Sequence, residues 1–479
     1  MLKAARWWFI LLTLVSIPNA QAQLPAEKRA ASDWITQNDA RLVAVNRRIW
    51  QLAELGLQEH QSSATLSDWL GENGFTVEKG VAHMPTAFIA SYGSGKPVIA
   101  ILAEFDALPG LSQKAAPERE AREDNANGHG CGHSVFGTAS TAAAIALRHA
   151  MAKHNLPGTI RLYGTPAEET GIGKIYLVKA GRFDDCDAVL HWHAGDRTQS
   201  SFGFTKALVS VKYGFRGLAA HASRSPHEGK SALDAVELMN VAANFLREHV
   251  PEDARMHYVI TDGGGQPNVV PPTAQVWYYL RADKHHTVEY MFQRLADIAK
   301  GAALMTGTTV ESQVDSDTHE ILPNWPLAQL IQKNLELVGP PQFNEEEKAF
   351  ARKTQEPLPN KPELALAETI EKLSAEPEQG KASTDVGDVS WKVPTIGFTV
   401  ATHTLGAPGH SWQIVACTGG TIGEKGMAIA AKTLTYSAIE LLQSPALLKQ
   451  ARADFEQRKA GYNFISLIPE GQRAPASIR

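Results

Sequence analysis

Cysteine and histidine occur together in a glycine-rich segment that reads Gly128-His-Gly-Cys-Gly-His133. Glycine leaves the backbone free to turn tightly, so this segment can carry Cys131 and His133 to one side. Thiolate and imidazole together are ligands that suit zinc and related divalent ions. The segment therefore predicts a metal site. The competing interpretation is a turn whose histidines are only solvated.

Two adjacent carboxylates, Glu168 and Glu169, follow an apolar run that ends at Tyr163. On an extended backbone neighbouring side chains point in opposite directions, so one glutamate can bind metal while the other faces a substrate. Metal-assisted hydrolysis needs both roles, because it uses a ligand for the ion and a general base that takes a proton from water. Most such pairs are solvent-facing charges, and the position of this pair after an apolar run favours a functional role.

Histidines recur in two later segments. His191 and His193 are two residues apart at the end of an apolar run, and His410 lies in the turn-rich segment Ala407-Pro-Gly-His-Ser-Trp412. A surface histidine is an equally good interpretation of His410 alone. Ligands gather at the carboxyl ends of the strands in an α/β sheet, so we expect the separate segments to converge there.

A cysteine nucleophile is the rival interpretation, with Cys131 as thiolate and His129 or His133 as its base. It leaves the two glutamates and the later histidines without a role. A serine nucleophile is not indicated, because no GxSxG segment occurs.

Composition places the chain among ordinary globular proteins. It has 479 residues, of which 43% are apolar and 20% charged, and a formal net charge of −5. A nucleic-acid-binding protein is normally basic, so the charge argues against that class. Three cysteines, Cys131, Cys186 and Cys417, are too few and too scattered for a disulfide framework.

The N-terminus has the pattern of a secretory signal peptide, residues 1–22. Lys3 and Arg6 precede a short apolar run, and Ala20 and Ala22 supply the small residues of a cleavage site. The run is too short to span a bilayer. We therefore expect a periplasmic or secreted protein that does not contact the membrane after cleavage.

Apolar runs and helical patterns alternate along the first part of the chain. Residues 88–92, 98–103, 160–163 and 188–192 are predicted strands, and residues 134–154 are a predicted helix. The order changes to βαββαβ after residue 206. This predicts an α/β fold, with a mixed-sheet catalytic domain covered by helices on both faces and interrupted by an inserted ferredoxin-like lid and dimerisation domain. The expected boundaries are 33–205 and 321–442 for the catalytic domain, 206–320 for the lid and 443–479 for a polar tail.

Taken together, these motifs resemble the dinuclear metal amidohydrolase and peptidase family of carboxypeptidase G, aminoacylase and hippurate hydrolase. The segments GHGCGH, PAEE, DAVLHWH, AHAS and PGHSW occur in that order, and the resemblance covers roughly residues 33–442. Within the family the chain is similar to the aminobenzoyl-glutamate hydrolases.

The resemblance implies roles for particular residues. Glu168 corresponds to the general acid/base and Asp106 to a carboxylate that orients a ligand. Most of the wider family has a metal-binding histidine two residues before that aspartate, where this chain has Glu104. The implied cofactors are two divalent metal ions, zinc or manganese. Their implied ligands are Cys131, His133, Glu169, His193 and His410.

The inserted domain of this family dimerises. His221 matches a histidine that reaches the active site of the partner subunit and stabilises an oxyanion. Asn268 and Arg281 match residues that hold the carboxylate and amide carbonyl of the substrate. The implied assembly is a homodimer, and the aminobenzoyl-glutamate branch adds the alternative of a hetero-oligomer with a related A-type subunit.

The resulting expectation is an enzyme that hydrolyses the amide bond of N-acyl or N-aroyl amino acids, such as aminobenzoyl-glutamate, or of dipeptides. Two alternatives stay open. One is a non-catalytic protein of the same fold that binds carboxylate ligands, and the other is the cysteine-dependent hydrolase. No nucleic-acid partner is expected.

Overall fold

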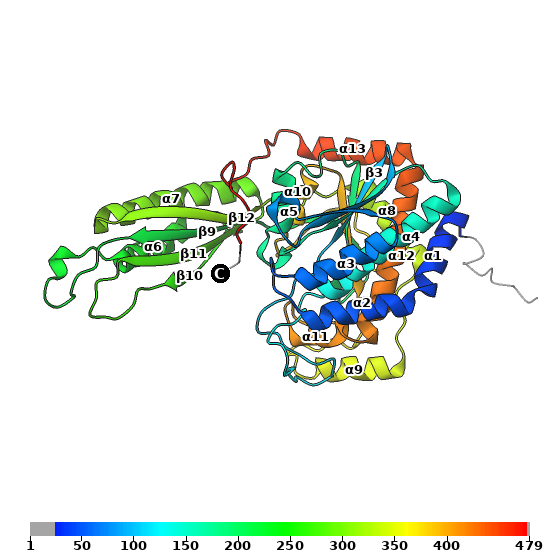
Figure 1. Ribbon diagram of the computed structural model, residues 1–479, viewed down its shortest axis with the longest axis horizontal. Helices are drawn as coiled ribbons and strands as arrows, with labels where there is room; N and C mark the ends of the chain where they lie inside the picture. The colour runs from blue at the N-terminus through cyan, green and yellow to red at the C-terminus, as the bar shows by residue number, and fades with distance from the viewer. Residues whose placement is uncertain (1–23, 477–479) are drawn as a thin grey trace, which may run out of the picture.

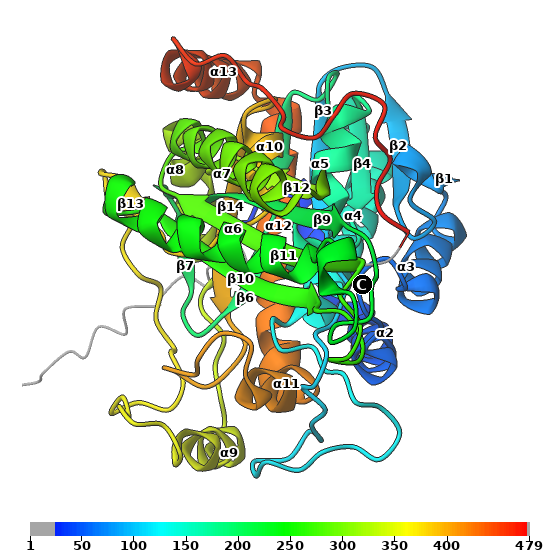
Figure 2. The same cartoon turned by 90° about the vertical axis from the view of Figure 1, so that its left-hand side faces the viewer.

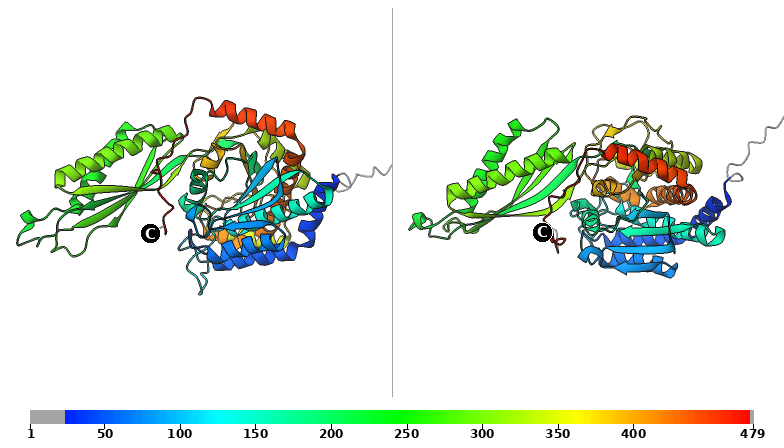
Figure 3. Two further views of the ribbon diagram at one scale, coloured as in Figure 1. Left: turned by 45° about the horizontal axis from the view of Figure 1, so that its top comes forward. Right: turned by 90° about the horizontal axis from the view of Figure 1, so that it is seen from above.

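The computed structural model describes residues 24–476 (Figure 1). The expected signal peptide lies outside this range. Within it, none of the helices combines the length and apolar character that crossing a membrane requires. The chain forms a large domain and a smaller inserted domain that projects from one side of it (Figures 1 and 3).

The large domain is built on a mixed sheet, which has eight strands within the described residues. The strand order is β1-β2-β4-β3-β5-β14-β6, and β7 pairs with β14. β3, β4, β5, β14 and β6 are parallel to one another, whereas β1, β2 and β7 pair in antiparallel fashion. The strands are β1 (Thr76–Lys79), β2 (Phe88–Ser94), β3 (Val98–Ala103), β4 (Gly158–Gly164), β5 (Ala188–Leu190), β6 (His193–Gly195), β7 (Gln199–Ser201) and β14 (Thr395–Ala401).

Helices cover both faces of this sheet, as β3 shows. All its residues are buried, and alternate side chains point to opposite faces. Ile99 and Ile101 join the core beneath α4 and α12, whereas Ala100 and Leu102 join the core beneath α5 and α10. The helices are α1 (Ala26–Gln37), α2 (Asp39–Leu52), α3 (His60–Glu72), α4 (His133–His154), α5 (Gly173–Lys179), α8 (Trp325–Val338), α9 (Glu345–Gln355), α10 (Val386–Ser390), α11 (Trp412–Thr418), α12 (Thr421–Gln443) and α13 (Pro445–Lys459).

The inserted domain is an antiparallel sheet with the order β10-β11-β9-β12, on which α6 and α7 pack (Figure 2). Its elements are β9 (Ala207–Arg216), α6 (Ala232–Leu246), β10 (Arg255–Asp262), β11 (Thr273–Ala282), α7 (His285–Thr306) and β12 (Thr309–Thr318). This is the βαββαβ order expected from the sequence. Beside the junction of the domains, β8 (Gly203–Phe204) pairs with β13 (Glu378–Gln379).

The end of the chain differs from the expected polar tail. Ser444 caps the N-terminus of α13 by accepting a hydrogen bond from the backbone of Leu447, and Ala451 and Phe455 are buried beneath the helix. Residues 460–476, here called the C-terminal segment, then cross the junction between the two domains (Figures 1 and 3). The charged residues on the exposed face of α13 make the composition of this segment polar, so its composition did not indicate an amphipathic helix.

Candidate functional site

Five side chains from distant parts of the sequence meet at one end of the large sheet. Cys131 precedes α4, His133 begins it, and His193 begins β6. The sulfur of Cys131 and a ring nitrogen of each of these histidines lie within 4.8 Å of one another. The same limit holds for Cys131, Glu169 and His410. We call Cys131, His133, Glu169, His193 and His410 the ligand cluster, and Cys131 belongs to both halves of it.

Two distances within the ligand cluster are as short as, or slightly shorter than, those between donors to one ion. The sulfur of Cys131 is 3.4 Å from Nε2 of His193, and Nε2 of His410 is 3.1 Å from Oε2 of Glu169. Donors bound to one zinc ion at tetrahedral angles lie about 3.3–3.6 Å apart, because zinc bonds are about 2.0–2.3 Å long. The side chains are therefore arranged closely enough to share cations.

Asp106 orients two members of the ligand cluster. Its Oδ1 accepts a hydrogen bond of 2.8 Å from Nδ1 of His133, and its Oδ2 accepts one of 3.0 Å from the backbone nitrogen of Glu169. Burial opposes the charge on Asp106, but His133 holds the pKa of this carboxyl below its usual value. The contact leaves Nε2 of His133 as the ligating nitrogen.

Unpartnered buried atoms show that cations fit the ligand cluster. Nε2 of His133, Oε2 of Glu104 and Oε1 of Glu169 are buried without a hydrogen-bond partner, although buried polar atoms are normally paired. The first two lie 3.2 Å apart. Carboxylates are also concentrated here, with Lys174 as a buried counter-charge. Divalent ions would neutralise this excess, and the thiol, imidazole and carboxylate donors suit zinc or manganese.

Glu168 and Glu169 lie on a 3-10 turn rather than on the extended backbone expected from the sequence. Ala167 has a φ of 55°, which bends the chain after β4 and starts this turn at Glu168. The two side chains still diverge, since Glu169 meets His410 while Oε2 of Glu168 is 3.9 Å from Nε2 of His133. Burial and the neighbouring Glu104 raise the pKa of Glu168 to about 8. A carboxyl tuned to this range suits proton transfer near neutral pH.

The motifs did not reveal a buried charge network beneath Glu168. Nζ of Lys174 lies 2.6 Å from Oδ1 of Asp385 and 2.8 Å from Oε1 of Glu104, and all three side chains are almost completely buried. Burial opposes the charge of Lys174, but Asp385 and Glu104 raise the pKa of its ammonium group above the usual value. The sequence feature that could have indicated this network is a lysine within the apolar helix α5, because a buried ammonium group needs charged partners.

The three residues expected on the inserted domain occupy different places. Arg281 lines a small cavity of about 50 Å³ together with Glu168, and its Nε has no hydrogen-bond partner. His221 and Asn268 instead lie near each other on loops at the opposite end of β11, where the backbone of Ala222 donates to the carbonyl of Asn268. The length of β11 separates Arg281 from this pair by roughly 25 Å. Only Arg281 lies at the ligand cluster of its own chain.

The environment of Cys131 does not favour a nucleophilic thiolate. Burial and the adjacent Glu169 raise the pKa of the thiol above its usual value. His129, one of the two candidate bases, is directed elsewhere, because its Nε2 lies 3.0 Å from the carbonyl oxygen of Ile49. Burial also lowers the pKa of His129 to about 4.

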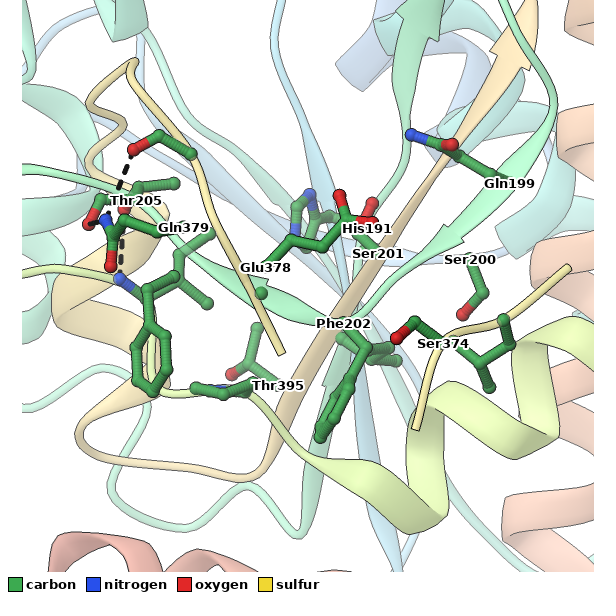
Figure 4. A pocket seen from close by; sticks show the side chains of 18 of the residues that line it. His191, Gln199, Ser200, Ser201, Phe202, Thr205, Ser374, Glu378, Gln379 and Thr395 are labelled. Atoms are coloured by element: carbon green, nitrogen blue, oxygen red, sulfur yellow. Dashed lines mark hydrogen bonds between the residues drawn. The ribbon is translucent and has the colours of Figure 1, made fainter. Parts of the chain in front are cut away.

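His191 lies outside the ligand cluster, although it is two residues from His193. It lines a separate cavity of about 280 Å³, together with Phe202, Glu378 and Thr395 (Figure 4). Its ring packs so tightly on β14 that a Cβ added at Gly397 would clash with the imidazole. The strand is interrupted between the two histidines, since β5 stops at Leu190 and β6 starts at His193.

Comparisons with known proteins give the ligand cluster its context. Residues 100–416 match the model of peptidase family M20/M25/M40. The chain is 40% identical to the B subunit of p-aminobenzoyl-glutamate hydrolase from Escherichia coli (strain K12), over 90% of this chain and 95% of that protein. It is 29% identical to the Xaa-Arg dipeptidase of Mus musculus, over 91% of this chain and 94% of the relative.

The fold is similar to that of the YXEP protein of Bacillus subtilis, a dinuclear metal binding peptidase from the M20 family. The TM-score is 0.55 at 18% identity, and the likeness covers 85% of this chain and 99% of the other. The chain therefore belongs to peptidase family M20/M25/M40, and it is a metal-dependent amidohydrolase that acts on C–N bonds.

Proposed function

We propose that this enzyme hydrolyses the amide bond next to a free carboxylate in N-acyl or N-aroyl amino acids of the p-aminobenzoyl-glutamate type, or in dipeptides. The observation that carries the proposal is the shared cavity of Glu168 and Arg281 beside the ligand cluster. In this cavity Glu168 is a proton acceptor, and Arg281 is a cation that suits a carboxylate. The relative from Escherichia coli is a subunit of p-aminobenzoyl-glutamate hydrolase, and the relative from Mus musculus is an Xaa-Arg dipeptidase. Both support these substrate classes.

The ligand cluster is the proposed seat of two divalent ions. Cys131, His133, Glu169, His193 and His410 would hold them, with zinc or manganese as the candidate metals. Bound there, the ions would supply positive charge that polarises the amide carbonyl and makes water a better acid. Asp106 keeps His133 and the backbone of Glu169 in position for this role.

Glu168 is the proposed acid and base of the reaction. Its carboxylate accepts a proton from the attacking water and then donates that proton to the nitrogen of the leaving amine. The raised pKa of Glu168 lets one group perform both transfers. Arg281 faces the same cavity, where its planar guanidinium would hold the substrate's carboxylate by two parallel hydrogen bonds.

A homodimer is the proposed assembly. His221 is exposed, and Ser223 and Arg224, its hydrogen-bond partners, belong to its own turn. Asn268 lies beside it and also far from the ligand cluster. A second copy of the chain would bring both residues to the active site, where His221 would stabilise the developing oxyanion. Because the Escherichia coli relative is the B-type component of its hydrolase, a hetero-oligomer with an A-type subunit is the second candidate.

The proposed location is the periplasm or the extracellular space. The basic, apolar and small-residue pattern of residues 1–22 supports it. Scavenging of acylated amino acids or peptides outside the cell would agree with such a location.

The substrate class is tested by measuring amine release from p-aminobenzoyl-glutamate, N-acyl amino acids and dipeptides, using protein loaded with zinc or manganese. We expect hydrolysis of at least one free-acid substrate and a much lower rate with its carboxamide. Equal rates for acid and carboxamide would contradict the role given to Arg281. Ligand binding without any hydrolysis would instead support the non-catalytic carboxylate-binding alternative.

Removal of metal is expected to destabilise the protein, because the buried carboxylates lose their counter-charge. Free metal at about 1,000 times its Kd would stabilise the folded protein by about 4 kcal/mol. Scanning calorimetry of chelator-treated and reloaded protein would show this as a recovered Tm. The control is calcium at the same ionic strength, since calcium prefers an all-oxygen donor set. A Tm that is indifferent to zinc and manganese would contradict the metal site.

A further inference from the structure

The C-terminal segment connects the inserted domain to the large domain. On the inserted domain, the hydroxyl of Tyr462 donates to Oε1 of Glu289 at 3.1 Å. The backbone nitrogen of Leu467 donates to Oδ2 of Asp317 at 2.5 Å, and Nε2 of Gln472 donates to the carbonyl of Val314 at 2.6 Å. These partners lie on α7 and on β12, and the chain returns to the large domain after β12.

The same segment is also held by the large domain. Nζ of Lys179 on α5 donates to the carbonyl of Ile468 at 2.9 Å and to that of Pro469 at 2.5 Å. The ring of Tyr462 packs at 4.6 Å from the ring of Trp391, next to α10. Ile468 is almost completely buried, although it lies only eleven residues from the end of the chain. The C-terminal segment is therefore a structural bridge across the junction (Figure 3).

A stack of three rings lies at the centre of this junction. His285 begins α7, and His319 lies where β12 leads back to the large domain; their rings are stacked at 3.7 Å. Phe464 of the C-terminal segment packs on His319 at 4.3 Å. Each histidine also contacts a carboxylate, since Nε2 of His285 is 2.7 Å from Asp317 and Nδ1 of His319 is 3.2 Å from Asp388. One stack thus joins the inserted domain, the connecting strand and the C-terminal segment.

Arg281 lies close to this stack along the chain. It lies near the end of β11, and three residues separate it from His285, the first residue of α7. Nε of Arg281 has no hydrogen-bond partner, and its guanidinium lies 5.6 Å from the ring centroid of Tyr279 on the same strand. Both residues belong to the inserted domain, so the contacts that anchor His285 at the junction also help to fix where this domain places Arg281 relative to Glu168.

We propose that the C-terminal segment sets the pose of the inserted domain, and that His285, Tyr462 and Phe464 are positioning residues that hold Arg281 over Glu168. The proposal rests on the proposed function, because it gives Arg281 the substrate's carboxylate. Loss of the bridge leaves the inserted domain held by its two connections and by direct contacts such as that of Ser316 with Gly171, so that it rotates more easily. Arg281 then meets the carboxylate less often, so KM for free-acid substrates rises while the proton transfers by Glu168 are unchanged.

The charge on His285 makes the bridge dependent on pH. Burial opposes protonation, but Asp317 and Glu289 raise the pKa of His285 to about 9. The titratable and charged groups around His285 come from four places. Glu289 and Lys284 lie near it on the chain, and Asp317, His319 and Glu320 lie at the second connection. Asp388 belongs to α10 and Tyr462 to the C-terminal segment. Since the folded-state pKa lies above the unfolded value of about 6.5, the stabilisation is complete below that value and is lost as the pH rises through about 9.

The test compares the full-length double variant Tyr462→Phe/Phe464→Ala with wild type. The substrates are p-aminobenzoyl-glutamate and its diamide. We expect KM for the diacid to rise about tenfold, with kcat and the rates for the diamide unchanged; tenfold corresponds to about 1.4 kcal/mol of lost binding. Hydrogen–deuterium exchange should accelerate at residues 281–289 and 317–320. Tyr462→Phe alone keeps the ring stack and should show a smaller change in the same direction.

The matched control is Tyr290→Phe/Ile465→Ala, which alters an exposed tyrosine on α7 and an exposed residue of the C-terminal segment. It should behave as wild type. Unchanged KM and unchanged exchange in the Tyr462/Phe464 variant would overturn the proposal. A separate result would show that the proposed function is wrong: wild type and Arg281→Met would each hydrolyse the diacid and the diamide at equal rates. In that case, accelerated exchange would still support the bridge, and unchanged exchange would reject it.

Discussion

Replacement of Glu168 by glutamine is expected to lower turnover by about 100-fold or more, the range set by loss of a general base. Glutamine keeps the size of the side chain but accepts no proton from water at neutral pH. The five proposed ligands do not include Glu168, whose Oε2 lies 3.9 Å from Nε2 of His133. We therefore expect the variant to retain both metal ions and the wild-type Tm.

The measurement combines kcat with metal analysis by mass spectrometry on the same sample. Glu72→Gln is a suitable control, because Glu72 is an exposed glutamate far from the ligand cluster. Full metal content with an unchanged kcat would remove Glu168 from the mechanism. A variant that loses metal as well as activity would show that Glu168 is a ligand instead.

Replacement of Lys174 by methionine is expected to lower the free energy of unfolding by about 3–5 kcal/mol. The substitution keeps the apolar stem of the side chain but leaves Asp385 and Glu104 buried without their shared cation. Uncompensated buried charge is far more costly than a lost surface contact. The expected effect should therefore be visible in chemical denaturation of metal-loaded protein.

Lys333→Met is the matched control, because it also removes an ion pair but at the surface. Lys333 pairs with Glu440 at 2.7 Å and is 65% exposed. Such a pair contributes about 0–1 kcal/mol, so the two variants should differ by several kcal/mol. Equal stability of the two variants would mean that Asp385 and Glu104 are not ionised in the folded protein.

The sequence contains most of the information that predicts the ligand cluster. Cys131 and His133 are recognisable because glycines surround them, and His410 is recognisable only through its resemblance to a family motif. The βαββαβ order of the inserted domain follows from alternating and helical patterns, since each of its elements has one buried face. For these residues and elements, the spacing of residue types along the sequence already indicates which side chains face the core or the site.

Contacts between distant residues could not be predicted in the same way. The pairing of Lys174 with Asp385 spans 211 residues, and neither residue lies in a distinctive motif. The C-terminal segment was expected to be a polar tail because its composition is polar. Its function as a bridge depends on single residues such as Tyr462 and Phe464, whose partners lie on α7 and beside α10. The place of His191 also depends on tertiary structure, since β5 ends before it at Leu190 and its ring packs against β14 at Gly397.

The inserted domain divides the proposed ligands of the large domain into two groups along the chain. Four of them precede β9, whereas His410 follows β14. Chains are made from the N-terminus at about 5–20 residues per second, so an emerging polypeptide lacks His410 for roughly 10–40 seconds after His193 has been made. Assembly of the proposed metal centre is therefore a late event in biogenesis, and a product terminated before His410 would lack one of its ligands.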